Sequence, residues 1–322
     1  MRVLVTGGAG FIGSHLCEEL LRRGHAVAVL DDLNDFYSPH MKRANLEEIR
    51  RWGRVEFREG DIRDEDIVAG LMREHRPEAV IHLAARAGVR PSLSQPLLYE
   101  QVNVGGTIVL LEACRRLGVR KFILASSSSV YGAGNAVPFH ENELNLRPMS
   151  PYAATKLAAE KMCYTYSQLY GLEVVCLRFF TVYGPRQRPD LAIRKFAESM
   201  LAGRRIPIYG DGETARDYTF VSDTVEGIVS ALDYEAHYEV FNLGNSRPVK
   251  LAELVTALEQ ILGVKALLDR LPDQPGDVPI TYADISKAAS RLNFQPRTPI
   301  EEGLRVMSEW LRLPQVQAKA LK

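Results

Sequence analysis

Residues 2–13, Arg2-Val3-Leu4-Val5-Thr6-Gly7-Gly8-Ala9-Gly10-Phe11-Ile12-Gly13, join a short β-branched run to a glycine-rich turn, and a helical pattern follows as far as Arg23. A glycine turn between a strand and a helix lets the backbone approach a phosphate, which then faces the N–H donors and the positive dipole of the helix N-terminus. Glycine turns also occur for steric reasons alone, so it is this context that favours a dinucleotide site. The residues expected to contact the cofactor here are Gly7, Gly10, Phe11, Ile12 and Gly13.

The same alternation of strand and helix patterns continues along the chain. Strand patterns cover residues 3–6, 26–30, 55–58, 79–83, 121–126 and 174–178, and helical patterns lie between them, including a long one over residues 97–117 and another that opens near Pro151. Right-handed crossovers between such units build a doubly wound parallel sheet of the Rossmann type. The predicted fold class is therefore α/β, with a smaller mixed α/β lobe toward the C-terminus.

The rhythm loosens after Gly184, where Pro and Gly become frequent. We expect residues 1–184 to form the dinucleotide-binding domain and residues 185–312 to form mainly the substrate-binding lobe. A later segment near residues 215–245 is a candidate to return to the first domain. Residues 313–322 lack a clear anchor and are expected to be frayed.

Composition excludes several classes of partner. The 322 residues carry 40 basic and 40 acidic side chains, so no net field attracts nucleic acid or an anionic membrane. Met1 leads directly into a strand pattern without a charged leader or a long apolar segment, which predicts a cytoplasmic protein. The four cysteines, Cys17, Cys114, Cys163 and Cys176, lie in apolar patterns without CxxC spacing, so we expect buried thiols and no metal site.

Tyr152 and Lys156 lie four residues apart in the run Ser150-Pro151-Tyr152-Ala153-Ala154-Thr155-Lys156. Residues at this spacing share one face of a helix, so the phenol and the ammonium project into the same space. A neighbouring cation favours the phenolate, whose ordinary pKa is about 10. A phenolate can take a hydroxyl proton while a nicotinamide takes a hydride, so the pair predicts a redox enzyme.

Carboxylates at the ends of the next two strands predict the type of cofactor. Asp31 and Asp32 end the second strand, where a carboxylate accepts hydrogen bonds from the adenosine ribose and repels an additional phosphate, so NAD is favoured over NADP. The alternative is that Asp31, Asp32 and Asn34 only form a turn. Asp61 and Ile62 end the third strand and are expected to flank the adenine, unless Asp61 is simply a helix cap.

At this point the sequence resembles the extended short-chain dehydrogenase/reductase family, specifically its nucleotide-sugar epimerases and dehydratases. The match extends to about residue 312 and rests on the glycine loop, Asp61-Ile62, His82-Leu83-Ala84-Ala85, Asn103, residues 126–132, Tyr152, Lys156 and Arg216-Asp217-Tyr218. The resemblance implies that Tyr152 is the base, that Lys156 lowers its pKa and binds the nicotinamide ribose, and that Ser127 hydrogen-bonds the reacting hydroxyl. It also implies cofactor contacts from Leu83, Ala84, Ala85 and Asn103.

The loop Ser127-Ser128-Ser129 discriminates among these relatives. Sugar 4,6-dehydratases carry Thr-Asp-Glu there, and UDP-glucuronate decarboxylases keep a Glu at the last position. A serine hydroxyl cannot replace a carboxyl group in proton transfer near neutral pH. Elimination and decarboxylation are thus disfavoured, and the remaining chemistry is oxidation followed by reduction of one carbon, which is epimerisation.

Three stretches resemble UDP-glucuronate 4-epimerases more than UDP-glucose 4-epimerases, namely residues 34–37, 87–90 and 181–190. A uronate carboxylate in a closed site needs strong hydrogen bonds, and an arginine offers a planar donor fork. Arg188, with Thr181, Ser128 and Ser129, can supply them. The alternatives are that Arg186 or Arg188 pairs with the diphosphate or with Asp190 and never meets the sugar, and that Arg90 is a surface or dimer residue.

The nucleotide end of the substrate is assigned by resemblance only. Gln274-Pro275-Gly276-Asp277 matches the segment that holds the nucleotide, with Gln274 where hexose epimerases usually have Arg, so Arg216 is expected to bear more of the diphosphate charge. The expected substrate is a UDP-sugar, most simply UDP-glucuronate, with a dTDP or GDP sugar left open. UDP-glucose or UDP-N-acetylglucosamine 4-epimerase is the nearest alternative, and a non-enzymatic NAD-binding regulator is a remote one. The resemblance also implies a homodimer built from the helix before Leu117 and the helix that carries Tyr152.

Overall fold

The large sheet of the protein is parallel throughout and has seven strands. The computed structural model describes residues 1–272, 278–314 and 316. The strands, in spatial order, are β10 (Tyr238–Leu243), β6 (Glu173–Phe179), β5 (Lys121–Ser127), β4 (Ala79–His82), β1 (Arg2–Thr6), β2 (Ala26–Asp31) and β3 (Val55–Glu59). The strand order reverses between β1 and β4, which is where doubly wound sheets bind their ligands. The predicted fold class is confirmed.

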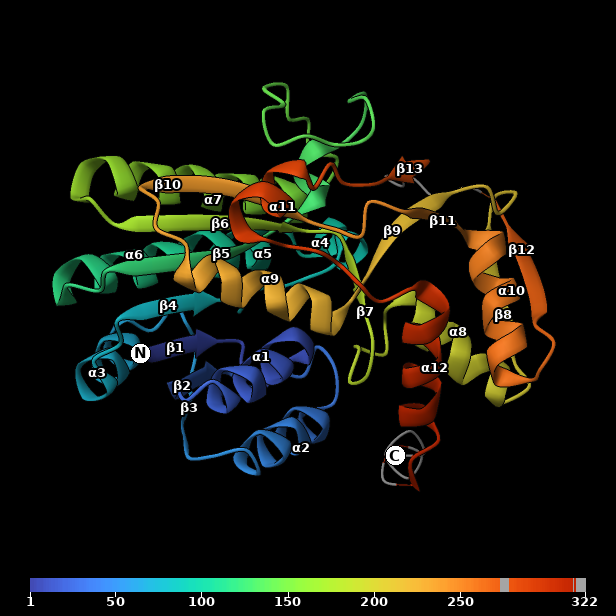
Figure 1. The fold of residues 1–322 in the computed structure, drawn as a ribbon, viewed down its shortest axis with the longest axis horizontal. Coiled ribbons are helices and arrows are strands. Elements are labelled where there is room, and N and C mark those ends of the chain that lie inside the picture. Colours follow the sequence, from blue (N-terminus) through green and yellow to red (C-terminus); the bar gives the residue numbers. More distant parts are fainter. Residues whose placement is uncertain (273–277, 315, 317–322) are drawn as a thin grey trace.

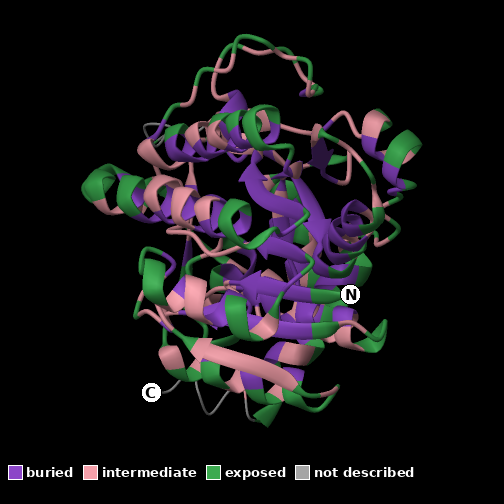
Figure 2. Ribbon diagram, turned by 90° about the vertical axis from the view of Figure 1, so that its left-hand side faces the viewer, coloured by how far each residue is buried: buried purple, intermediate pink, exposed green. Residues whose placement is uncertain are grey.

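Helices cover both faces of this sheet (Figure 1). Val3 and Val5 of β1 face one core, together with α1 (Phe11–Arg22), α2 (Pro39–Arg50) and α9 (Val221–Asp233). Leu4 faces the opposite core, together with α3 (Glu65–His75), α6 (Gly106–Leu117) and α7 (Pro151–Tyr170). Successive side chains of a strand point to opposite faces, so one short apolar run serves both layers. Figure 2 shows these strands buried between helices whose outer faces are exposed.

The segment expected to be one helix over residues 97–117 is interrupted. Short helices α4 (Val89–Ser94) and α5 (Pro96–Glu100) lead into a π-helical turn, η1 (Gln101–Gly105), before α6 begins. Such π turns concentrate at functional sites. This one places Asn103 beside the chain that leaves β4, as described below.

The remaining elements form a smaller lobe at the carboxyl end of the sheet (Figure 1). A second sheet contains β7 (Thr181–Tyr183), β9 (Ala215–Phe220), β11 (Pro248–Lys250) and β13 (Ile280–Thr281). A separate parallel pair joins β8 (Arg205–Tyr209) to β12 (Leu267–Leu271). The helices of this lobe are α8 (Ala192–Leu201), α10 (Leu251–Leu262) and α12 (Ile300–Leu311), while α11 (Ser286–Leu292) packs against β10 and α9.

Residues 221–243 supply α9 and the edge strand β10 to the large sheet, after the chain has already built much of the smaller lobe. The chain therefore returns from the smaller lobe to the large sheet before it completes the smaller lobe. The tail expected to fray from residue 313 lies largely outside the described residues. Of the helices that the structure describes, none combines the length and the apolar character needed to cross a membrane.

Candidate active site

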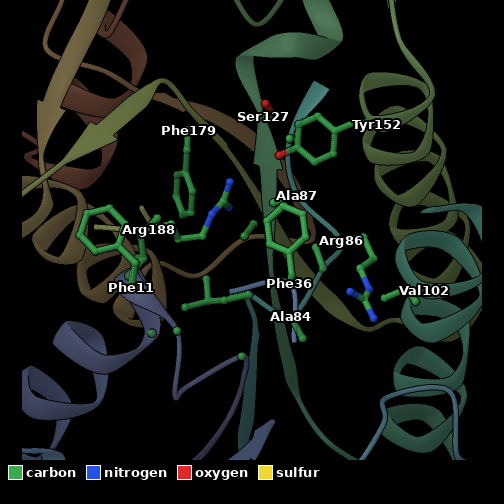
Figure 3. Close-up of a pocket in the computed structure, with 18 of the residues that line it drawn as sticks. Phe11, Phe36, Ala84, Arg86, Ala87, Val102, Ser127, Tyr152, Phe179 and Arg188 are labelled. Atoms are coloured by element: carbon green, nitrogen blue, oxygen red, sulfur yellow. The ribbon is translucent and has the colours of Figure 1, made fainter. Parts of the chain in front are cut away.

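A cavity of 460 Å³ lies at the carboxyl ends of the central strands, between the large sheet and the smaller lobe. Backbone of the glycine turn lines one end, and the serines after β5 line the other (Figure 3). Most of the residues expected in the site line it: Gly7, Gly10, Phe11, Ile12, Gly13, Asp31, Asp32, Asn34, Asp61, Ile62, Leu83, Ala84, Ala85, Ser127, Ser128, Ser129, Tyr152, Lys156, Thr181 and Arg188. Folding thus brings the glycine turn near the N-terminus together with the serine loop, Tyr152 and Arg188 in one cavity.

The glycine turn needs glycine for close packing. Gly7 has φ of 72°, and a Cβ there would lie 2.7 Å from the backbone nitrogen of Ala84. A Cβ on Gly13 would lie 2.8 Å from Gly8 Cα and would also overlap the carbonyl oxygen of Gly7. No side chain caps the N-terminus of α1. The first residues of that helix, Phe11, Ile12 and Gly13, line the cavity, so its uncapped N-terminus suits a pyrophosphate there.

Asp31 is a buried carboxylate whose two oxygens are both used by the turn. Oδ2 accepts from the Ala9 N–H at 3.1 Å and Oδ1 accepts from the Leu33 N–H at 3.0 Å. Burial raises the pKa of Asp31, while the nearby charge of Lys42 opposes that rise. Asp31 thus holds the glycine turn in shape, as the turn-forming alternative predicts, and it also lines the cavity.

Asp32, Asn34 and Asp61 stand at the same end of the cavity. Asp32 Oδ1 accepts from the Asn34 N–H at 3.1 Å, so this pair does form a turn. Asp61 pairs with Arg63 at 2.6 Å, which lowers the pKa of the Asp61 carboxyl. The alternative that Asp61 caps the next helix is wrong, because Asp64 caps α3 by accepting from the N–H groups of Asp66 and Ile67.

A chain of hydrogen bonds runs beneath the cofactor end. The Ala84 N–H donates to Thr6 Oγ1 at 3.2 Å, and Thr6 Oγ1 contacts His82 Nδ1 at 2.7 Å. His82 Nε2 contacts Thr107 Oγ1 at 3.0 Å, and that hydroxyl donates to the Asn103 carbonyl at 2.6 Å. Burial lowers the pKa of His82 to about 3, so the imidazole is neutral. A neutral ring that accepts at Nδ1 and donates at Nε2 satisfies every contact in the chain.

Asn103, for which a cofactor contact is predicted, is not among the described residues that line the cavity. Its amide nitrogen donates to the Arg86 carbonyl and to Thr155 Oγ1, each at 3.0 Å, and its Oδ1 accepts from the Arg86 N–H at 2.8 Å. Both ends of the amide are therefore used in holding the backbone after β4. Asn103 shapes the wall that Arg86 and Ala84 present to the cavity.

Tyr152 and Ser127 meet at the centre of the cavity (Figure 3). Ser150 caps α7 by accepting from the Ala153 N–H at 3.2 Å, and Pro151 occupies the first turn, so the helix starts just before Tyr152. Burial raises the pKa of Tyr152, and the hydrogen bond with Ser127 and the charge of Arg188 oppose that rise. The site therefore favours a neutral phenol that is poised next to a hydroxyl.

Lys156 is buried at the cavity. Its Nζ donates to the Ala125 carbonyl at 2.8 Å, and burial lowers its pKa to about 8. The role predicted for Lys156, which is to lower the pKa of Tyr152 and to bind the nicotinamide ribose, stays a prediction.

A buried ion pair lies directly behind Lys156. Glu160, one turn further along α7, binds Arg178 of β6 through Oε1 to Nε at 2.9 Å and Oε2 to Nη2 at 2.8 Å. Ser126, the neighbour of Ser127, also donates to Glu160 Oε1, at 2.5 Å. Glu160 therefore connects α7, β5 and β6 at the point where the reacting side chains emerge. No sequence signal singled it out, because a glutamate on a helix is usually solvated.

Arg188 lies in the cavity with its guanidinium 5.3 Å from the centre of the Phe36 ring. It also pairs with Asp190, through Nε to Oδ1 at 2.9 Å and Nη2 to Oδ2 at 2.8 Å. The alternative that Arg188 pairs with Asp190 is thus realised, yet the same side chain remains part of the cavity wall. Both arrangements are compatible, because a guanidinium has five N–H donors.

A second cavity of 140 Å³ adjoins the first and shares Ser128, Ser129 and Thr181 with it. Arg216 lines this cavity and donates to the carbonyl of Ala215 at 2.9 Å. Val278 and Thr281 of β13 also line the second cavity. Gln274 and Asp277, the other residues expected here, lie outside the described residues.

Two arginines predicted to contact the substrate, Arg90 and Arg186, are absent from the described lining of the large cavity. Arg186 forms a bidentate ion pair with Glu18 of α1. Arg90 is exposed, and its guanidinium lies 5.0 Å from the centre of the Tyr209 ring. Both contacts join residues that are distant in sequence, and sequence spacing does not reveal such partners.

Lys42 and Arg86 line the cofactor end and were not expected there. Lys42 is buried, and its Nζ donates to the Asn34 carbonyl at 2.9 Å and lies 4.9 Å from the centre of the Tyr37 ring. A lysine in a charged helix gives no signal of burial. Arg86 follows the end of β4, and its position just beyond the carboxyl end of a central strand was a usable signal.

The chain also matches known proteins. Residues 4–307 match the family model described as GDP-mannose 4,6 dehydratase. The chain belongs to this family. It is a branch of the extended short-chain dehydrogenases/reductases, as the sequence resemblance implies.

Several named proteins are similar to this chain over nearly its whole length. UDP-glucuronate 4-epimerase of Thermodesulfobacterium geofontis is 44% identical over 308 residues, which cover 95% of this chain and 95% of the relative. UDP-glucuronic acid 4-epimerase from Bacillus cereus, solved in complex with UDP-glucuronic acid and NAD, is 36% identical with a TM-score of 0.91 over 97% of this chain and 99% of that one. UDP-glucose 4-epimerase from Thermotoga maritima, solved with UDP-glucose, is 36% identical with a TM-score of 0.90 over 100% of both chains.

Proposed function

We propose that this protein catalyses the NAD-dependent epimerisation of UDP-glucuronate at carbon 4, which gives UDP-galacturonate. The observation that carries the proposal is the meeting of Tyr152, Ser127 and Lys156 in one cavity whose opposite end is a glycine turn at a helix N-terminus. Relatives named UDP-glucuronate 4-epimerase, and the Bacillus cereus complex with UDP-glucuronic acid and NAD, support it. A binding protein without activity would not need a phenol, a serine and a lysine converging at this point.

The residues present fit NAD. The glycine turn and the first N–H groups of α1 suit the pyrophosphate, and Asp32 and Asn34 line the position expected for the adenosine ribose. Lys156, next to the serines, suits the nicotinamide ribose. When bound, NAD supplies a nicotinamide ring that takes a hydride and later returns it. Two acidic residues at the ribose position, Asp31 and Asp32, disfavour the additional phosphate of NADP.

In the proposed reaction, the phenolate form of Tyr152 takes the proton of the 4-hydroxyl as the hydride leaves carbon 4. The hydroxyl of Ser127 turns from Ser129 Oγ to hydrogen-bond the reacting oxygen, and the charge of Arg188 favours the phenolate form of Tyr152. The product of this half-reaction is a 4-keto sugar. The sugar ring then rotates about its diphosphate linkage and presents its other face, and Tyr152 returns the proton to the same oxygen with inverted configuration at carbon 4.

The serine loop supports epimerisation over elimination or decarboxylation. Ser128 and Ser129 line the cavity, and the acidic residues among its described lining, Asp31, Asp32 and Asp61, all lie at the cofactor end. General acid–base chemistry at carbons 5 and 6 needs a carboxyl group within hydrogen-bond reach. The described lining offers no carboxyl group at the serine loop, so the 4-keto sugar is preserved until the hydride returns.

Recognition of the uronate carboxylate is assigned to Arg188, Thr181, Ser128 and Ser129. The three hydroxyls line both cavities and so surround the place where a hexose joined to a diphosphate in the smaller cavity would project. Arg188 adds the positive charge that a desolvated carboxylate requires. Arg216, in the smaller cavity, is assigned to the diphosphate.

A neutral hexose is the second candidate substrate. The bidentate pair between Arg188 and Asp190 compensates the charge of the guanidinium, which favours an uncharged sugar beside it. The similarity to the Thermotoga maritima UDP-glucose 4-epimerase is compatible with this alternative. Turnover of UDP-glucose that is unaffected by Arg188→Ala would establish it.

The deciding experiment is incubation of the purified protein with UDP-glucuronate, first without added NAD and then with it, followed by anion exchange and NMR of the sugar. UDP-galacturonate as the main product supports the proposal, and its formation without added NAD indicates retained cofactor. No conversion of UDP-glucuronate alongside turnover of UDP-glucose would replace the uronate with a neutral hexose.

The assembly we propose is a homodimer through α6 and α7. Large apolar side chains on these helices are exposed in the single chain, namely Leu117, Tyr164, Leu169 and Tyr170. Light scattering after gel filtration should give twice the mass of 36.0 kDa.

We also propose that the protein works in the cytoplasm, because all four cysteines are free, buried thiols, as is usual in a reducing compartment.

A further inference from the structure

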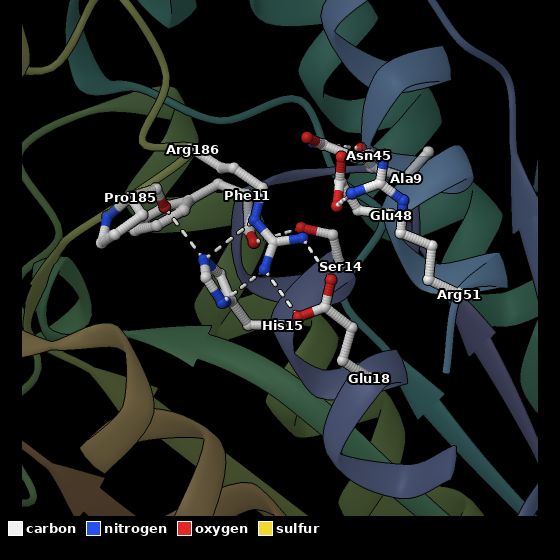
Figure 4. Close-up of polar contacts among 10 residues, drawn as sticks. All are labelled: Ala9, Phe11, Ser14, His15, Glu18, Asn45, Glu48, Arg51, Pro185 and Arg186. Atoms are coloured by element: carbon white, nitrogen blue, oxygen red, sulfur yellow. Dashed lines mark hydrogen bonds and ion pairs between the residues drawn. The ribbon is translucent and has the colours of Figure 1, made fainter. Parts of the chain in front are cut away.

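Arg186 and Glu18 form an ion pair between two segments that are far apart in sequence. Nη1 of Arg186 lies 2.6 Å from Glu18 Oε1, and Nη2 lies 2.8 Å from Oε2, so the contact is bidentate (Figure 4). Both side chains are largely buried, with 12% and 17% of their surfaces exposed. A charge-assisted fork of this kind is strong and sets a definite geometry. The pair fixes the loop after β7 to the middle of α1.

His15 completes the contact from the other side of the guanidinium (Figure 4). Its Nε2 lies 2.9 Å from the Pro185 carbonyl and 3.2 Å from Arg186 Nε, and its Nδ1 lies 2.7 Å from Arg186 Nη2. Both ring nitrogens therefore face N–H donors of a guanidinium, to which a doubly protonated ring could offer no acceptor, so the imidazole is neutral. Burial, followed by the charge of Arg186, lowers the pKa of His15 to about 3, which agrees with this state. His15 thus binds two consecutive residues of the loop.

The loop that these contacts hold is residues 184–191. Arg186 has φ of 64°, a left-handed conformation that residues other than glycine seldom adopt, so its backbone relies on surrounding contacts. The next residue, Gln187, is buried and donates through Nε2 to the Val182 carbonyl at 3.0 Å. Further along, Arg188 and Leu191 line the large cavity. The loop is therefore one wall of the site, anchored from outside by Arg186.

Helix α1 forms the neighbouring wall of the cavity, where Phe11 lies beside Arg188 (Figure 3). Its first residues, Phe11, Ile12 and Gly13, line the same cavity, and the Phe11 ring packs edge-on against His15 at 6.1 Å between ring centres. One ion pair and one imidazole consequently join the helix that faces the pyrophosphate position to the loop that carries Arg188. Neither Arg186 nor Glu18 lines the cavity among the described residues.

We propose that Arg186 is a positioning residue, which with Glu18 and His15 clamps residues 184–191 onto α1, retains NAD and keeps Arg188 in the cavity. The inference rests on the proposed function for the identity of the cofactor and the sugar. It goes beyond that function because it links retention of NAD at α1 to the position of the sugar-binding loop, residues 184–191. Without the clamp the loop is free to move away from α1, so NAD leaves faster and Arg188 no longer has one position relative to the sugar.

The test uses the NAD-loaded holoenzyme and four variants. Arg186→Asn removes the fork but keeps a residue that tolerates the left-handed backbone, and Glu18→Gln removes the charge of its partner. The double variant measures whether the two residues act as a unit. The matched control is Glu226→Gln, which removes the ion pair of Glu226 with Arg23, a contact of 2.6 Å at the far end of the same helix. Release of NAD is followed by capture with a coupled dehydrogenase, and each melting temperature is recorded.

We expect Arg186→Asn and Glu18→Gln each to accelerate NAD release about tenfold, with the double variant no faster than the faster single one, because they share one interaction. Glu226→Gln should release NAD at the wild-type rate. Unchanged release in the clamp variants, or equal acceleration in Glu226→Gln, would overturn the proposal and leave the pair with a stabilising role only. Should Arg186→Asn fail to fold, Arg186→Lys, which keeps the charge without the fork, must release NAD faster than the wild type.

Substrate kinetics separate this proposal from the assignment of the substrate. If the wild type converts UDP-glucuronate, the clamp variants should raise its KM more than they lower kcat, because Arg188 is displaced while Tyr152 is untouched. If the wild type converts only UDP-glucose, the uronate assignment is wrong. Accelerated NAD release in the clamp variants would still support the clamp, and unchanged release would reject it.

Discussion

Ser127 Oγ donates a hydrogen bond to Ser129 Oγ over 3.1 Å, and the Ser129 N–H donates back to Ser127 Oγ over the same distance. The last serine of the loop therefore faces the hydroxyl that meets Tyr152. A carboxyl group at residue 129 would stand beside the reacting sugar, where it could exchange protons with the 4-keto intermediate. The identity of this one residue is thus expected to influence the fate of that intermediate.

Ser129→Glu should raise the yield of the UDP-pentose by-product from UDP-glucuronate. A 4-keto uronic acid is a β-keto acid that tends to lose carbon dioxide, and the new carboxyl group would supply the missing acid. Anion exchange of the products gives the ratio of UDP-pentose to UDP-galacturonate. Ser129→Ala serves as the control that removes the hydroxyl alone, and an identical ratio in both variants would contradict this role of the loop.

Tyr152→Phe should lower kcat by about 10² to 10⁴, the usual contribution of general acid–base catalysis, while NAD remains bound. The matched control is Tyr99→Phe, because the Tyr99 ring lies edge-on to that of Tyr152 at 6.2 Å and its hydroxyl donates to the Ala87 carbonyl instead. Steady-state kinetics should show a much smaller loss for Tyr99→Phe. Comparable losses of kcat in the two variants would mean that Tyr152→Phe acts through altered packing and not through loss of a catalytic hydroxyl.

Lys156 should make stability depend on pH in the alkaline range. Burial lowers its pKa from 10.5 to about 8, so between these values the unfolded chain binds more protons at this site than the folded chain does. Stability from this site therefore rises with pH across that window, and the cost of the buried charge is fully present below pH 8. The difference between these two pKa values corresponds to about 3 kcal/mol in the free energy of unfolding.

The measurement is urea unfolding of the cofactor-free wild type and of Lys156→Met at several pH values from 7.5 to 10.5. The wild type should gain stability relative to Lys156→Met as the pH rises. A difference that stays constant over this range would mean that Lys156 titrates near its ordinary pKa in the folded protein.

Arg178→Met should cost about 3 to 5 kcal/mol in the free energy of unfolding, because it leaves the Glu160 carboxylate buried without a counter-ion. Both side chains are almost fully covered, with 4% and 2% of their surfaces exposed. The double variant Glu160→Leu with Arg178→Met should cost less than the sum of the two single losses. Additive losses in denaturant titrations would show that the two residues stabilise the fold independently.

Much of the fold was predictable, because local pattern and topology agree. The strand and helix patterns of residues 1–184 specify a parallel sheet with crossovers, and the glycine turn between β1 and α1 locates the cofactor end. The position of β10 was less accessible, since a strand from residues 238–243 pairs with β6, which ends at Phe179. Pairing of strands distant in sequence depends on the assembled sheet edge and not on any local signal.

The candidate site shows the same division. Tyr152, Lys156, the glycines and the serine loop could be located from motifs, because their chemistry requires particular residue types at fixed spacing. The pKa shifts were less accessible from the sequence, because burial is their largest cause: burial raises the pKa of Tyr152 and lowers the pKa of Lys156. Asn103 likewise supports the wall of the cavity through Arg86 and does not line it.

The sequence by itself determined the doubly wound sheet, the dinucleotide end and the reacting side chains, since periodicity and short motifs act over a few neighbouring residues. Only the tertiary structure decided the partner of each charge. Arg186 and Arg188 are two residues apart in one loop, yet Arg186 pairs with Glu18, 168 residues away, while Arg188 lines the cavity. A long, flexible cation can reach many carboxylates, and which one it binds depends on the surfaces that folding brings within a few ångströms.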